Sequence, residues 1–177
     1  MTRILALSGS LRQNSSSNLI LHAITSLAPN DVAIDRYDSL GDLPHFNDPE
    51  ADPASVQEFK RKIREADAVL ICTPEYAFGI PGTLKNAIDW CVGTGEFVSK
   101  PVGLVTASSQ GEKGHAALLL VLSAISANVI DESSLLLSFV RAKIDKEGNV
   151  KDQELLNILK GITLGLTVAS DKKKYAD

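Results

Sequence analysis

The sequence contains few cysteines, and this excludes two classes of protein. There are 2 cysteines among 177 residues, far below the density of a disulfide-stabilised secreted scaffold. Cys72 and Cys91 lie inside apolar segments and lack the paired spacing of zinc ligands, so no metal site is expected. Cys72 is expected to act as a small buried apolar side chain. This cysteine usage favours a reducing cytoplasm.

An excess of positive charge and a long hydrophobic run are also missing. Lysine and arginine number 18 against 22 aspartates and glutamates, which gives a net charge of −4. Because polyanions are held by clustered cations, a nucleic acid partner is not expected. No stretch reaches the roughly 18 uncharged apolar residues of a membrane span; residues 116–130 are better explained as a buried helix leading into a strand. With no secretory signal recognised, we expect a cytoplasmic protein without membrane association.

The chain does contain enough apolar residues for one core. Its 177 residues, 44% of them hydrophobic, correspond to about one domain of roughly 150 residues, so residues 1–177 are expected to form a single domain. Short apolar runs alternate with helical periodicities. The predicted strands are residues 4–7, 32–37, 68–72 and 102–106, and the predicted helices lie around residues 20–27, 56–63, 84–91, 118–125 and 155–166.

A fifth strand is expected between residues 128 and 139, where two apolar runs compete for it. Residues 131–134 between these runs fit either a loop or an exposed strand. Strands that alternate with helices indicate an α/β fold, in which an open parallel sheet is covered on both faces. Ligands of such sheets bind beyond the carboxyl ends of the strands, so the turns after the first, third and fourth strands are the candidate site.

The turn after the first strand has the composition of a phosphate-binding loop. Gly9 permits a tight turn, Arg12 offers a charged donor, and the following helix begins with unpaired N–H groups that favour an anion. Neither the Walker motif nor the dinucleotide fingerprint is present, and the loop has no nucleophilic cysteine. The alternative is a polar loop with Ser17 or Asn18 as an ordinary helix cap. The candidate donors are Ser10, Arg12, Ser15, Ser16, Ser17 and Asn18.

The turn after the third strand has a different chemistry. Two prolines and two glycines between residues 74 and 82 define an exposed backbone, and Tyr76 and Phe78 offer flat apolar faces. Backbone amides near Glu75 can serve the polar edge of a planar heterocycle. The predicted contacts of this heterocycle are Pro74, Glu75, Tyr76 and Ala77.

These motifs resemble the NADPH-dependent FMN reductase family of flavodoxin-like proteins, which includes quinone, chromate and azo-dye reductases. The resemblance rests on Gly9-Ser10-Leu11-Arg12, Thr73-Pro74-Glu75-Tyr76 and the run of residues 81–90. It implies a three-layer fold with five parallel strands in the order 2-1-3-4-5. It also implies that Ser10, Arg12 and the hydroxyls of residues 15–17 hold the FMN phosphate, and that residues 74–77 line the isoalloxazine ring. Ser108, Ser109 and Gly111 would lie beside the pyrimidine edge of the ring.

The resemblance further implies a two-electron reductase that uses NADPH or NADH as hydride donor. Its small-molecule electron acceptor would be a quinone, a flavin, an azo compound or a metal oxyanion, and its subunits would form a dimer or tetramer. The flavin carries such chemistry, so no catalytic side chain is expected. Two alternatives are a flavin-binding electron carrier and a flavin-free regulator on the same fold.

The chain departs from the family pattern at three places that bear on these expectations. In the phosphate loop, Ser17 stands where the family usually has asparagine, and Asn18 follows one residue later. Ala77 stands where the family usually has asparagine, so only the backbone of that position is expected to contact flavin. The pair Gly114-His115 replaces a common Gly-Gly pair. A bulky residue there can narrow the electron-acceptor side of the cleft, but His115 is expected to face solvent. Glu75 is expected to have a structural or solvent-facing role rather than a catalytic one.

Overall fold

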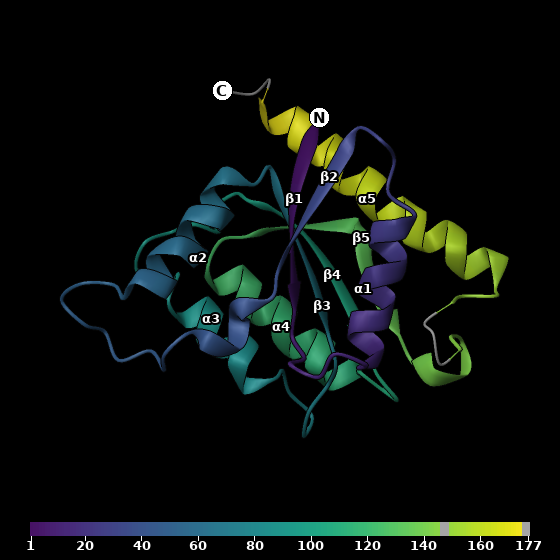
Figure 1. The fold of residues 1–177 in the computed structure, drawn as a ribbon, viewed down its shortest axis with the longest axis horizontal. Helices are drawn as coiled ribbons and strands as arrows, with labels where there is room; N and C mark the ends of the chain where they lie inside the picture. Colours follow the sequence, from purple (N-terminus) through teal and green to yellow (C-terminus); the bar gives the residue numbers. More distant parts are fainter. Residues whose placement is uncertain (146–148, 175–177) are drawn as a thin grey trace.

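A computed structural model describes residues 1–145 and 149–174. Five strands form one parallel sheet in the order β2-β1-β3-β4-β5 (Figure 1), as the resemblance implied. The strands are β1 (Thr2–Ser8), β2 (Val32–Tyr37), β3 (Ala68–Thr73), β4 (Pro101–Ala107) and β5 (Asn128–Leu137). The helices are α1 (Ser16–Ser26), α2 (Ala54–Glu65), α3 (Gly82–Asp89), α4 (Glu112–Ala124) and α5 (Gln153–Lys174), and two short 3-10 helices are η1 (Ser39–Asp42) and η2 (Val140–Ala142).

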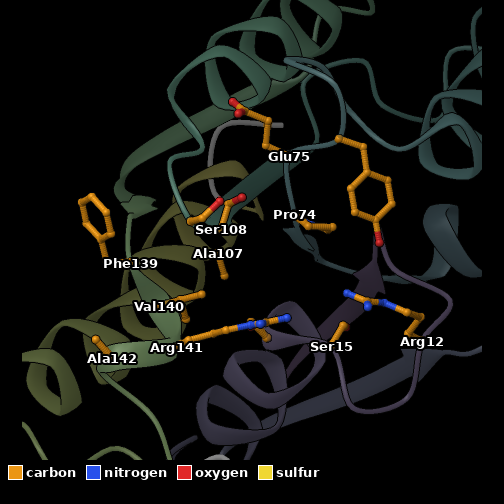
Figure 2. A pocket seen from close by; sticks show the side chains of 13 residues that line it. Arg12, Ser15, Pro74, Glu75, Ala107, Ser108, Phe139, Val140, Arg141 and Ala142 are labelled. Carbon is orange, nitrogen blue, oxygen red and sulfur yellow. The ribbon is translucent and has the colours of Figure 1, made fainter.

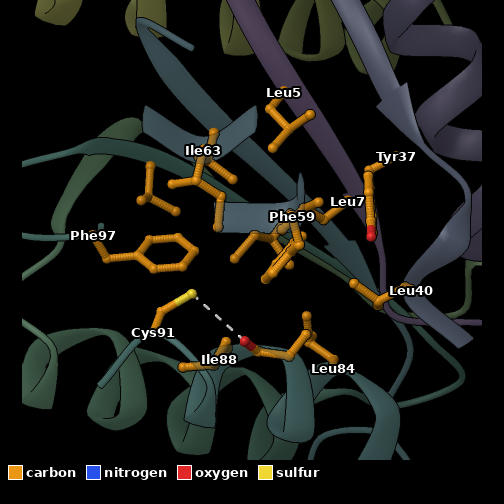
Figure 3. Packing of buried hydrophobic residues seen from close by; sticks show 14 of the residues in the cluster. Leu5, Leu7, Tyr37, Leu40, Phe59, Ile63, Leu84, Ile88, Cys91 and Phe97 are labelled. Carbon is orange, nitrogen blue, oxygen red and sulfur yellow. Dashed lines mark hydrogen bonds between the residues drawn. The ribbon is translucent and has the colours of Figure 1, made fainter. Parts of the chain in front are cut away.

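The two faces of the sheet bury two separate apolar clusters, because successive side chains of a strand point to opposite faces. Leu5 and Leu7 pack with α2, α3 and α4 on one face, whereas Ile4 and Ala6 pack with α1 and α5 on the other. Figure 3 shows Leu5, Leu7 and Phe59 inside the first cluster. The three layers therefore follow from near-continuous apolar strands covered on both sides.

The fifth strand includes both of the apolar runs that competed for it. Val102 of β4 pairs with Val129, but Leu104 pairs with Ser134, so β5 bulges between these two pairs. Inside the bulge, Ser133 is fully buried and its hydroxyl donates to the Ile162 carbonyl of α5 at 2.8 Å. A bulge keeps a strand paired while accommodating extra residues, which explains why the polar residues 131–134 do not end β5.

The carboxyl ends of β1, β3 and β4 meet at one edge of the sheet. β3 lies between β1 and β4 in the parallel register, so the turns that follow these three strands are neighbours in space. Helix α1 begins at Ser16, before the predicted helical residues 20–27, because Ser15 forms its N-cap. The fold thus brings the three predicted turns together.

Candidate functional site

One cavity of about 490 Å³ joins the three turns at this edge of the sheet. Figure 2 shows Arg12 and Ser15 on one side of it and Glu75 and Ser108 across from them. Eight predicted residues line the cavity: Arg12, Ser15, Ser16, Pro74, Glu75, Tyr76, Ser108 and Ser109. Five predicted residues do not: Ser10, Ser17, Asn18, Ala77 and Gly111.

The first turn presents an anion-binding end to the cavity. The Ser15 hydroxyl accepts from the backbone N–H of Asn18 at 3.3 Å and so caps α1. Helix α1 has no acidic residue in its first turn, which leaves the positive end of its dipole without a competing carboxylate. Arg12 is exposed beside it. A negatively charged group fits this end of the cavity.

The remaining polar residues of the first turn bond to one another. Asn18 is buried, and its side-chain amide donates to the carbonyl oxygens of Arg12 at 2.6 Å and Ser10 at 3.4 Å. Arg36 at the end of β2 in turn donates to the Asn18 side-chain oxygen at 2.9 Å. Ser17 is fully buried, with its hydroxyl 3.1 Å from that of Ser15. These hydrogen bonds hold the loop in its conformation.

The turn after β3 is built from its backbone. Tyr76 and Gly79 exchange two backbone hydrogen bonds of 2.9 Å, and the two residues between them have positive φ angles, +49° at Ala77 and +60° at Phe78. Two successive positive φ angles define a type I′ turn, which favours asparagine and glycine. Alanine and phenylalanine are strained there. Tyr76 and Phe78 remain exposed.

A carboxylate anchors this strained turn to the neighbouring helix. Glu75 accepts a 2.7 Å hydrogen bond from the backbone N–H of Gly114 in the first turn of α4. A Cβ on Gly114 would lie 3.0 Å from the Glu75 side chain and from the Gly79 carbonyl oxygen. Glycine at position 114 therefore allows the close approach, and Glu75 has the expected structural contact.

The expectation for His115 was wrong. His115 is half-buried, with Nδ1 2.9 Å from the Thr106 hydroxyl and Nε2 3.5 Å from the Ser134 hydroxyl. Burial lowers the pKa of His115 below its usual value. The ring faces inward because the first turn of α4 lies on β4 and β5, a packing that the local sequence does not reveal.

The turn after β4 contributes Ser108 and Ser109 to the cavity, but Gly111 has another role. Gly111 has φ of +97°, and a Cβ there would lie 2.9 Å from the Leu136 side chain. The backbone at Gly111 therefore lies close to β5, and Gly111 does not line the cavity. Gly111 itself is the N-cap of α4 and provides no side chain, so neither serine caps this helix.

The cavity also has a wall that the sequence did not reveal. Ala107, Phe139, Val140, Arg141 and Ala142 line it. The backbone N–H groups of Phe139 and Val140 donate to the carbonyl oxygens of Ser109 at 3.1 Å and Ser108 at 3.2 Å. These bonds hold the segment after β5 against the turn after β4. No local motif marks this segment, because its place depends on pairing between β4 and β5.

Metal and thiol chemistry find no support among the described residues. In residues 1–145 and 149–174 no three His, Cys, Asp or Glu residues gather as metal ligands would. Both cysteines are buried free thiols, and burial raises the pKa of each, which disfavours the nucleophilic thiolate form. Cys91 donates to the Ala87 carbonyl at 3.6 Å (Figure 3). Within the same ranges, no helix combines the length and apolar character needed to cross a bilayer.

The residues around the cavity fit a phosphorylated planar ring. Hydroxyls, a guanidinium and a helix N-terminus stand at one end, and the buried Pro74 and exposed Tyr76 stand at the other. The model for the NADPH-dependent FMN reductase family matches residues 2–141. The chain belongs to this family. The matched region contains all three turns.

Relatives of known activity agree with this family. A quinone reductase of Escherichia coli K12 is 33% identical over 170 residues, with 90% of each chain covered. A 2-hydroxy-1,4-benzoquinone reductase of a Burkholderia species is 34% identical, with 86% of this chain and 87% of the relative covered. The solved structure of FerB, an NAD(P)H:acceptor oxidoreductase of Paracoccus denitrificans, has a TM-score of 0.79 at 26% identity and covers 97% of this chain and 98% of its own. This NADPH-dependent FMN reductase family member is an oxidoreductase that uses NAD(P)H and FMN.

Proposed function

We propose that the 490 Å³ cavity binds FMN in one orientation and exposes one face of its ring to NAD(P)H and then to a small acceptor. The observation that carries this proposal is the continuity of the cavity from Arg12 and Ser15 to Pro74, Tyr76 and Ser108. Ser15, Ser16 and Arg12 hold the phosphate. Pro74 to Tyr76 support the ring, and Ser108 and Ser109 lie at its polar edge. Ala77 contributes only through the backbone of its turn.

The protein's contribution is binding and orientation. Bound FMN supplies the redox chemistry of hydride uptake and release. Pro74 is buried and presents a rigid surface to the ring, while the network around Asn18 keeps the phosphate end in shape before binding. Preformed sites of this kind lose less conformational entropy on binding. A side-chain acid, base or nucleophile is not required.

We propose a quinone as the class of acceptor. Two relatives that match most of the chain bear the names quinone reductase and 2-hydroxy-1,4-benzoquinone reductase. The exposed aromatic side chains of Tyr76 and Phe78 suit a flat apolar acceptor at the rim. Turnover with benzoquinones, compared with an azo dye and chromate under the same conditions, tests this choice.

A spectroscopic titration tests the proposed function. FMN is added to the purified protein, the excess is removed, and the visible spectrum is recorded before and after anaerobic addition of NADPH and, separately, NADH. A protein-bound flavin spectrum that bleaches rapidly supports the reductase. Bound flavin that stays oxidised indicates an electron carrier instead. Absence of FMN binding and of turnover with added FMN indicates a regulator.

Arg12→Ala tests the orientation of the cofactor. A charge-assisted hydrogen bond contributes about 1.5–3 kcal/mol, so loss of Arg12 is expected to weaken FMN binding by roughly tenfold to a hundredfold. The thermal midpoint should stay near that of the wild type because Arg12 is exposed. Unchanged FMN affinity in a fluorescence titration would show the phosphate assignment to be wrong.

We further propose that residues 1–177 act as one domain in a cytoplasmic homo-oligomer. One continuous sheet supports the single domain, and two free thiols suit a reducing compartment. Exposed Leu120, Leu164 and Val168 leave apolar surface that self-association can bury. Sedimentation of a stable, active monomer would contradict the oligomer, and cell fractionation tests the location.

A further inference from the structure

Two of the six arginines differ from the others in their surroundings. Arg3, Arg36, Arg61 and Arg64 each donate to a carboxylate, an amide or a carbonyl oxygen of the protein. The guanidinium groups of Arg12 and Arg141 donate to no side chain or carbonyl within residues 1–145 and 149–174. Both of these guanidinium groups line the same cavity.

The two arginines that line this cavity are far apart in the sequence. Arg12 belongs to the turn after β1, and Arg141 belongs to η2, just after β5. Figure 2 shows the Arg141 side chain extending across the cavity floor toward Ser15, with Arg12 on the far side of that serine. A second hollow of about 450 Å³ is lined by both arginines together with Ser15 and Ser16. The phosphate end is thus flanked by two cations.

Hydrogen bonds of the preceding residues fix the position of the Arg141 backbone. The segment preceding it is bonded to the turn after β4 through Phe139 and Val140, and Val140 is buried. Asp145 is the carboxylate that lines the second hollow. One of its oxygens accepts from the Asn149 backbone N–H at 2.8 Å and the other from the Asn149 side chain at 2.9 Å. Both carboxylate oxygens of Asp145 therefore accept hydrogen bonds from Asn149.

We propose that Arg141 is a second phosphate-binding residue that closes on the FMN 5′-phosphate opposite Arg12; this inference rests on the proposed function. A phosphate monoester carries a charge of about −1.5 to −2 at pH 7. One guanidinium compensates only part of that charge, and the dipole of α1 adds a fraction more. A dianion placed between the two guanidinium groups would balance the positive charge of both. Arg141 thereby favours FMN over riboflavin, which has the same ring without phosphate.

The test compares FMN and riboflavin binding in Arg141→Gln with binding in Lys143→Gln. Lys143 is an exposed cation of the same segment that does not line the cavity, so both variants lose one positive charge. We expect Arg141→Gln apoprotein to bind FMN roughly tenfold to a hundredfold more weakly than wild type in fluorescence titrations at low salt, with riboflavin affinity changed less than twofold. Lys143→Gln should match the wild type for both ligands, and Arg141→Lys should recover part of the FMN affinity.

Three results would overturn the proposal. The first is equal FMN affinity in the two glutamine variants. The second is an equal loss of FMN and riboflavin affinity, because it would give Arg141 a merely structural role. The third is unchanged FMN affinity together with a loss confined to the KM for NADPH but not NADH, which would assign Arg141 to the nucleotide's 2′-phosphate.

Failure of this inference is distinguishable from failure of the proposed function. If wild-type apoprotein binds neither flavin, the proposed function is wrong. If the wild type binds FMN more tightly than riboflavin but Arg141→Gln retains that preference, only the role of Arg141 is wrong, and Arg12 with the start of α1 accounts for the phosphate.

Discussion

The two ends of the cavity are built in opposite ways. The turn between β1 and α1 is held by buried side chains, with Asn18 bonded to two carbonyl oxygens of the loop and to Arg36. The turn between β3 and α3 has two consecutive residues with positive φ, Ala77 and Phe78, and both are exposed. The turn after β1 is preorganised by polar hydrogen bonds, whereas the turn after β3 stores backbone strain that its anchors must offset.

This difference separates the effects expected of mutations. A change at the phosphate end should alter FMN binding and leave riboflavin binding intact, because riboflavin has no group to place there. A change at the ring end should alter the binding of both flavins. The ratio of the two affinities therefore reports which end a residue serves.

Gly9→Ala is expected to have the largest effect on stability, because it disrupts the packing of the turn after β1 against the end of β3. A Cβ on Gly9 would collide with Thr73 Oγ1 and lie 2.8 Å from Thr73 Cβ, at the end of fully buried β3. Overpacking of this severity costs about 3 kcal/mol of unfolding free energy. Gly82→Ala, at the start of α3 where nothing lies within 4 Å, should change it by less than about 0.5 kcal/mol. Urea denaturation measures both, and equal stabilities would show that the two strand ends are not packed this closely.

Glu75→Ala should weaken the ring end alone. It removes the acceptor of the Gly114 N–H, and an unpaired, partly buried donor costs about 1–3 kcal/mol. We expect a lower denaturation midpoint and weaker binding of both flavins by the same factor, measured by fluorescence titration. Glu75→Gln keeps an acceptor and should retain most of both properties. A loss confined to FMN would place Glu75 with the phosphate group.

Ala77→Gly should relieve the strain of the same turn. An L-residue in the left-handed region costs about 1–2 kcal/mol, and glycine offsets part of that gain by its greater freedom in the unfolded chain. A net increase of about 0.5 kcal/mol in unfolding free energy is expected. Ala116→Gly, at an exposed position of α4, should lower stability by about 1 kcal/mol. Destabilisation by both variants would show that Ala77 is not strained.

Much of the fold could be predicted from the sequence because its strands and helices have clear periodicities. Leu5 and Leu7 alternate with Ile4 and Ala6 between the two apolar clusters, which is the pattern of a strand covered on both faces. The bulge in β5 could not be predicted, since it depends on the contact of Ser133 with α5. The local polarity of residues 131–134 alone fits either a loop or an exposed strand.

The candidate site could be predicted only where its residues follow one another in the chain. The turns after β1 and β3 have recognisable compositions, and eight residues chosen from the three turns line the cavity. Arg141 was missed because its place is set by pairing of β4 with β5 and not by a motif. The inward direction of Asn18 was hidden for a related reason, since its partner Arg36 lies 18 positions away.

Substitution of His115 is expected to have the smallest effect on stability. It tests the pH dependence of stability near the turn after β3. His115 follows Gly114, which bonds to Glu75, and its two polar neighbours, Thr106 and Ser134, are uncharged hydroxyls. Burial lowers the pKa of His115 in the folded protein below its usual value of about 6.5. The unfolded chain therefore binds this proton more readily, so stability is complete above pH 6.5 and is lost as pH falls from there toward the folded pKa. Urea midpoints between pH 7.5 and 5.5 should fall less steeply for His115→Gln than for the wild type, and parallel curves would mean that the imidazole titrates as it does in water.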